Sequence, residues 1–169
     1  MLSKELSTII GGRYKEIYIQ SLSYKEFLQF HNLQDSDDAL AKYIQFGGLP
    51  GLVKIGLDED DASEYQKDVL NTVLLKDVIS RNNIRNVPFL ERLTSFIADN
   101  IGKIISASSI SKFMKSQGTN VSADTIIDYA QYLEDAYIIH KVNRYDIHSK
   151  RLFESNDKFY FEDHGLRNA

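Results

Sequence analysis

Apolar residues recur at helical spacing along most of the chain, which predicts a mainly α protein with small β elements. One helix is predicted after the N-cap candidate Ser23, and a second starts at Ser36 or Asp37 and ends at Gly47-Gly48. A long helix is predicted through "EYQKDVLNTVLLKDVISRNN", after a polar loop at "LDEDDAS". The next helix, "VPFLERLTSFIADNIG", has a predicted buried stripe of Phe89, Leu93, Phe96, Ile97 and Ile101.

The segment 104–163 follows the order helix, turn, helix, strand, strand. Ser106 or Ser108 is expected to cap its first helix, and Ser122 its second. "IHSKRLFESN", which would be the wing, joins the two predicted strands, "IIHKVNRYD" and "KFYFED". This order predicts a winged helix-turn-helix, so the expected fold is a helical bundle plus a winged helix-turn-helix. The expected core of the first helix is Ile110, Phe113 and Met114.

Near the N-terminus, alternating residues in "RYKEIYIQSLS" predict one strand between a helix at Leu2–Ile10 and the helix after Ser23. A single strand cannot make a sheet, so residues 1–35 are expected to be the end of a larger α/β core. Apolar surface around Ile17, Ile19 and Leu22 then predicts self-association through an unpaired edge.

Composition narrows the classes of function. The 169 residues have a net charge of −4, so any contact with nucleic acid has to come from a local basic patch. The absence of Cys excludes disulfides, thiol catalysis and cysteine metal sites. No signal peptide and no membrane-spanning run is visible, so we expect a cytoplasmic protein without membrane contacts.

Two short motifs are candidate sites. "FGGLPG" is either a hinge formed by Gly47, Gly48, Pro50 and Gly51, or a helix C-cap followed by a Pro-fixed turn. "DEDD" at 58–61 is either a solvated loop or a site for a hard cation, which needs converging oxygen ligands. The histidines are scattered, and we assign no catalytic residue and no metal site.

The predicted winged helix has an acidic second helix. In DNA-binding relatives of this shape the second helix enters the major groove. Here the segment 122–137 has four acidic residues and no Lys or Arg, so phosphates would repel it. The basic residues that would contact a partner or phosphates follow it, at Lys141, Arg144, Lys150 and Arg151.

Six stretches together resemble one large prokaryotic family of AAA-type ATPases. They are "LSKELSTIIGGRYKEIYIQSLSYKEFL", "YIQFGGLP", "LLKDVISRNNIRN", "IADNIGKIISASSISKFMKSQG", "YLEDAYIIHKVNRYDI" and "KFYFEDHGLRNA". Such proteins have a nucleotide-binding domain, then a helical and winged-helix region, then a restriction-nuclease-like domain of unknown role.

The resemblance implies a truncated chain with four parts. Residues 1–35 would be a remnant of the ATPase core, 36–103 a helical linker or lid, 104–163 the winged helix, and 164–169 a stub of the next domain. ATP and Mg would belong to the intact protein, because no Gly-Lys-Ser/Thr phosphate loop occurs here. Arg13 would then be a candidate arginine near the nucleotide domain.

These observations support two hypotheses. In the first, the chain is a non-catalytic module that contacts its own ATPase and nuclease-like domains or another protein. In the second, it is a DNA-binding winged helix that contacts phosphates through the wing.

Overall fold

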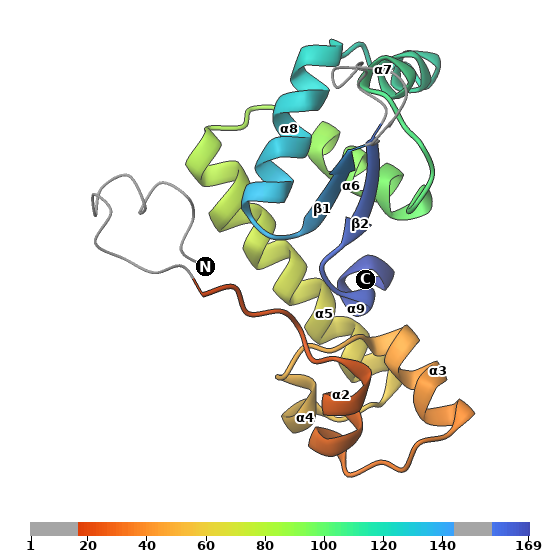
Figure 1. Ribbon diagram of the computed structural model, residues 1–169. Coiled ribbons are helices and arrows are strands. Elements are labelled where there is room, and N and C mark those ends of the chain that lie inside the picture. The colour runs from red at the N-terminus through yellow and green to blue at the C-terminus, as the bar shows by residue number, and fades with distance from the viewer. Residues whose placement is uncertain (1–16, 144–156) are drawn as a thin grey trace. The chain divides into compact units, whose positions relative to one another are not determined.

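The computed structural model describes residues 17–143 and 157–169 (Figure 1). These residues are mainly helical and include a small two-stranded antiparallel sheet, which confirms the predicted fold class at that level. None of the helices in the described part of the chain combines the length and apolar character needed to cross a membrane.

The chain divides into two compact units. Unit 1 comprises the residues up to Asp77 together with Phe161–Ala169, and unit 2 comprises Val78–Tyr160. This division differs from the predicted boundaries at 35, 103 and 163, since the last residues of the chain return to unit 1.

Unit 1 is built from helices whose ends are capped by side chains. The Ser23 N–H donates to Glu26 Oε2 at 2.9 Å, and Ser36 Oγ accepts the Ala39 N–H at 3.2 Å. These bonds satisfy backbone groups that a helix start leaves without partners. The predicted N-cap Ser23 is confirmed, and Ser36 is the N-cap of the second helix. The helices are α2 (Tyr24–His31), α3 (Asp37–Phe46), α4 (Leu52–Ile55), α5 (Glu59–Val73) and α9 (His164–Asn168).

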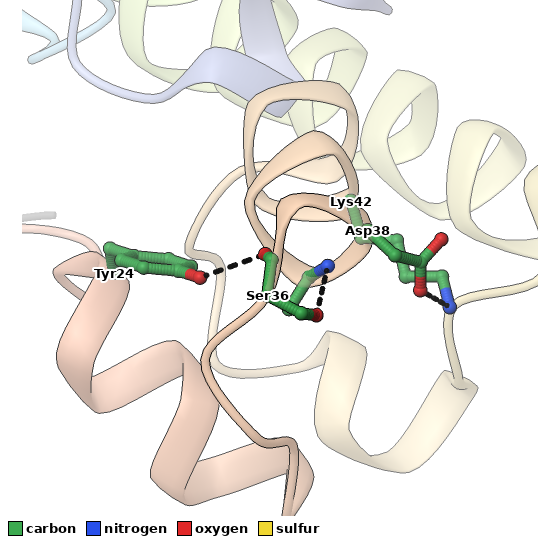
Figure 2. A network of polar contacts seen from close by, with 5 residues as sticks. Tyr24, Ser36, Asp38 and Lys42 are labelled. Carbon is green, nitrogen blue, oxygen red and sulfur yellow. Dashed lines mark hydrogen bonds and ion pairs between the residues drawn. The ribbon is translucent and has the colours of Figure 1, made fainter.

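Polar contacts hold the start of α3 against α2. Figure 2 shows the Tyr24 hydroxyl directed at the Ser36 carbonyl oxygen, 3.4 Å away, and the same hydroxyl donates to Asp35 Oδ1 at 2.8 Å. Lys42 and Asp38 form an ion pair of 2.8 Å one turn apart along α3. These exposed bonds position α3, whose far end forms the candidate site.

The acidic segment 58–61 begins α5, so the predicted polar loop at "LDEDDAS" is wrong. Asp58 is the N-cap, and its Oδ1 accepts the Asp60 N–H at 3.1 Å. The three acids that follow lie in the first helical turn, where the helix dipole favours negative charge. Acidic residues at this position therefore promote the helix.

Helix α5 continues directly into a π-helical segment, η1 (Leu74–Ser80). The two together occupy the predicted long helix. The boundary between the units falls inside η1, after Asp77. Buried Leu74 and Val78 lie one on each side of that boundary.

In the described part of unit 2, three α-helices are followed by two paired strands. Ser106 and Ser122 cap α7 and α8, as predicted, each accepting an N–H at 3.1 Å. Ile105 forms an isolated antiparallel bridge with Asp157 and so adds to the sheet edge. The elements are α6 (Val87–Asp99), α7 (Ala107–Ser116), α8 (Ala123–Asp135), β1 (Ile139–Asn143) and β2 (Asp157–Phe161, whose last residue belongs to unit 1). Fully buried side chains in its core include Leu90, Leu93, Ile97, Ile126, Leu133 and Ile139.

Two predictions about apolar residues are corrected. Residues 17–23 form no strand, because β1 and β2 pair with each other and no other strand in the described residues offers a ladder. Phe113, predicted as core, is 46% exposed, since Ile110 and Met114 occupy the inner face of α7. Phe96 and Ile101 are half-buried. The predicted helix at 2–10 lies outside the described residues.

A half-buried histidine predicts pH-dependent stability in unit 1. His31 Nε2 is buried without a hydrogen-bond partner among the described residues, and its ring lies 4.5 Å from that of Phe27, centroid to centroid. Burial lowers the pKa of His31 below its ordinary 6.5. The unfolded chain therefore binds this proton first, so the contribution is present above about pH 6.5 and is lost as pH falls below it.

We expect denaturant unfolding of the native chain to show a falling free energy between about pH 7 and about pH 5.5. His31→Phe removes the titrating group while keeping an aromatic ring, so its free energy of unfolding should be flatter over that interval. Equal slopes for the two proteins would contradict this assignment.

Candidate functional site

The "FGGLPG" motif forms the turn between α3 and α4. Helix α3 ends at Phe46, and Gly47 follows with φ 71° and ψ −162°, a conformation that favours glycine. Gly51 has ordinary helical angles and precedes α4. Phe46, Leu52 and Ala62 form a buried cluster beside the turn. The predicted helix C-cap and Pro-containing turn are therefore present.

Asp163 joins this turn to the C-terminal segment. Its side chain is 2% exposed, and its Oδ2 accepts the Gly48 N–H at 2.7 Å. Its Oδ1 accepts the N–H groups of Gly165 and Leu166 at 2.8 and 3.2 Å, which caps α9. A buried carboxylate is costly unless hydrogen-bonded, and this one has three backbone donors. One side chain thus holds two backbone segments together.

The last carbonyl groups of α3 are bonded by side chains from distant segments. The buried Gln66 amide donates to the Phe46 carbonyl oxygen. Asn168 Nδ2 donates to the carbonyl oxygens of Ile44 and Gln45 at 3.0 and 2.8 Å. A helix end leaves such carbonyls unsatisfied, so α5 and α9 together complete the end of α3.

The glycines allow the backbones to approach closely. A Cβ on Gly48 would lie 2.2 Å from the Leu22 carbonyl oxygen, and one on Gly165 would lie 2.3 Å from the Phe46 carbonyl oxygen. The Gly48 carbonyl also accepts the Leu22 N–H at 2.8 Å. We call the contacts of Leu22, Gly47-Gly48, Gln66 and residues 163–168 the interlock.

Tyr43 covers the interlock. Its hydroxyl donates to the Leu22 carbonyl oxygen at 2.9 Å, and its ring lies 5.6 Å from that of His164, centroid to centroid. Burial is the main cause that raises the pKa of Tyr43, and the charges of Asp163 and Glu26 add to it. The tyrosine therefore stays a neutral hydrogen-bond donor.

The interlock can hold the end of α3 and the C-terminal segment in place. It does not contain a set of side chains that could catalyse a reaction. Its polar groups bond to backbone, and no nucleophile with an adjacent base occurs among them. No group of three or more potential metal-ligating side chains occurs among residues 17–143 and 157–169. The function of Gly47, Gly48, Pro50 and Gly51 as a hinge stays a prediction.

Of the predicted contact residues, only Lys141 lies in the described part of the chain. Its Nζ lies 3.2 Å from Asp157 Oδ2, so it links β1 to β2. Arg144, Lys150 and Arg151 lie outside the described residues, as does Arg13.

Sequence reasoning missed Asp163, Gly165 and Gln66. Asp163 and Gly165 stand in "EDHGL". An Asp that precedes a short segment ending in an apolar residue, here Leu166, is a recognisable N-cap signal. Gln66 gives no such signal, because its importance comes from burial against the end of α3.

Two substitutions of Asp163 separate its cap from its bridge. Asn is a good N-cap, but its amide has only one oxygen. In either orientation its NH₂ group therefore faces a backbone N–H, that of Gly48 or those of Gly165 and Leu166. Asp163→Asn should therefore lower the free energy of unfolding by about 1–3 kcal/mol. Asp163→Ala should lower it by roughly another 1 kcal/mol through loss of the cap. Denaturant unfolding measures both, and unchanged amide exchange at Gly48 in Asp163→Ala would contradict the bridge.

The two glycine positions in the turn form a matched pair. Gly48→Ala places a methyl group against backbone, so we expect a loss of about 1–3 kcal/mol. Gly51→Ala places one 2.0 Å from the Tyr65 hydroxyl, the movable end of a side chain, in a helical conformation that Ala accepts. Its effect should be smaller. Equal losses in denaturant unfolding would show that close backbone packing is not what requires Gly48.

Comparison with known proteins gives one family and two long relatives. Residues 37–169 match the family described as "Domain of unknown function (DUF8612)". An "Uncharacterized protein" of Haemophilus influenzae is 33% identical, the match covering 99% of this chain and 42% of the relative. "Uncharacterized protein MJ1544" of Methanocaldococcus jannaschii is 30% identical, over 96% of this chain and 39% of the relative. The chain thus spans about two fifths of the length of these relatives. Because the family match covers most of its residues, the chain belongs to the DUF8612 family.

Proposed function

We propose that the chain is a non-catalytic helical and winged-helix module of an AAA-type ATP-binding protein, and that it makes interdomain or protein contacts. The resemblance of its six stretches to that ATPase family supports this. The greater length of the two relatives is compatible with further domains, among them one that binds ATP and Mg. A cytoplasmic location belongs to the same proposal.

The element order of unit 2 supports the winged helix. Helix α6 is followed by the bridging residue Ile105, then α7, α8, β1 and β2. A helix, a bridging residue, two helices and two paired strands follow the order that we expect of a winged helix-turn-helix. Figure 1 shows β1 and β2 side by side after α8.

The acidic outer face of α8 is the observation that carries the proposal. Asp124, Ile127, Asp128 and Gln131 are exposed on it, at spacings that place them on one side of the helix. The helix has no Lys or Arg. In the helix-turn-helix arrangement this is the helix that would meet the major groove, where phosphates flank it. Acidic side chains there favour a protein partner.

The interlock supports a function in connecting domains. The segment that follows β2 is hydrogen-bonded to the end of α3 and the turn after it through Asn168 and Asp163, and Gln66 bonds α5 to the same end of α3. We propose that force on this segment reaches the end of α3 through these bonds.

DNA binding through the wing is the alternative function, and the difference in formal charge between the two units supports it. Unit 2 has 11 Lys and Arg against 9 Asp and Glu, a formal charge of +2, whereas unit 1 has 9 against 15 and a charge of −6. The basic residues of unit 2 could hold phosphates without reading bases.

A titration of a labelled mixed-sequence duplex with the chain, followed by fluorescence anisotropy at two salt concentrations, separates the two. We expect no binding even at low salt. Binding that weakens steeply with salt would favour the alternative, because neutralised phosphates release counterions. Nucleotide turnover by the purified chain would contradict the non-catalytic assignment.

Two fourfold variants make that outcome specific. One replaces Lys141, Arg144, Lys150 and Arg151 by Ala. The matched control removes the same charge from exposed positions of unit 1, at Lys25, Lys54, Lys67 and Lys76. Duplex binding lost in the first variant and kept in the second would assign the wing as a phosphate contact.

A further inference from the structure

A groove of about 740 Å³ lies between α6 and α7 in unit 2. It is lined along one side by α6 and its following residue, and along the other by α7. We call it the α6–α7 groove. Its lining includes Glu91, Arg92, Phe96, Asp99, Phe113 and Met114.

Aromatic side chains form an apolar part of the groove. The rings of Phe96 and Phe113 lie 5.0 Å apart, centroid to centroid, and are tilted by 44°. Phe113 leaves 46% of its surface exposed, whereas Met114 beside it is buried. A large aromatic side chain gains stability when covered, so this surface favours an apolar partner group.

Two acidic side chains flank these rings along α6. Glu91 and Asp99 are exposed, and neither carboxylate bonds to another side chain in the described part of the chain. They are eight positions apart, which corresponds to about 12 Å along a helix axis. The one basic lining residue, Arg92, directs Nη1 to Thr119 Oγ1 at 2.8 Å. The acids are therefore available to a basic partner.

We propose that the α6–α7 groove binds a helical segment of a partner protein. That segment has an apolar side chain at one position and a Lys or Arg four residues before and four residues after it. These three positions share one face of a helix, and the outer two lie about 12 Å apart, which matches Glu91 and Asp99. Two helices that form an open groove with an apolar floor suit a helical ligand. The inference rests on the proposed protein-contact function and names its surface.

A designed helical peptide tests the proposal on the full chain. It has Leu at the central position and Lys four residues to either side. We expect salt-sensitive binding, with backbone amide shifts in NMR spectra confined to α6 and α7. Absence of binding at low salt, or shifts centred on other elements, would overturn the proposal.

Charge reversal makes the assignment specific. Glu91→Lys with Asp99→Lys should weaken binding of the Lys peptide by about tenfold, since two attractions become repulsions. The same variant should gain affinity for a peptide with Glu at the two flanking positions. The matched control, Glu64→Lys with Asp68→Lys on the exposed side of α5, makes the same change of charge outside the groove and should leave both affinities unchanged. If the control weakens binding of the Lys peptide equally, the effect comes from net charge alone, and the groove is rejected as the binding site.

The duplex titration keeps the two proposals distinguishable. Failure of the peptide together with failure of the duplex rejects the groove and leaves a protein-contact function through another surface. Duplex binding together with peptide failure rejects both.

Discussion

The hydrogen bond between Asp163 and the Gly48 N–H is the contact on which the arrangement of unit 1 depends. It joins residues 115 positions apart and places a buried charge between two backbone segments. Because a buried carboxylate is stable only with its donors in place, α9 and the end of α3 specify each other. The glycines at 47 and 165 follow from this, since side chains there would separate the two segments, whereas a side chain on Gly48 would meet the Leu22 backbone.

Local signals in the sequence were enough to predict most elements. Ser23, Ser36, Ser106 and Ser122 each stand at a helix start, and each acts within three residues of itself, so one short stretch contains the whole signal. The interlock joins segments far apart in the chain, and Gln66 gives no local sign of its function. The "FGGLPG" turn was predicted, but its partners were not.

The wrong predictions also have a physical cause: contacts that a local pattern does not contain. The predicted strand through Ile17 and Ile19 has the right alternation, but a strand also needs a neighbour, and these side chains are 73% and 84% exposed. Phe113 has the right spacing for the core, yet Ile110 and Met114 fill the inner face of α7. Periodicity identifies a face of a helix, and only packing decides how wide the buried part of that face is.

Unit 2 shows why a fold does not settle a function. Its formal charge is positive, yet the outer face of α8 is acidic, so the positive charge has to lie on other elements. Lys141 forms an ion pair with Asp157 within the sheet, so part of its positive charge is neutralised there. A domain whose acidic residues occupy both the outer face of α8 and the α6–α7 groove presents two surfaces that repel phosphate. Under the proposed protein-contact function, basic protein segments would meet the opposite conditions on both, so we use the distribution of acids, and not the helix order, as the guide to a partner.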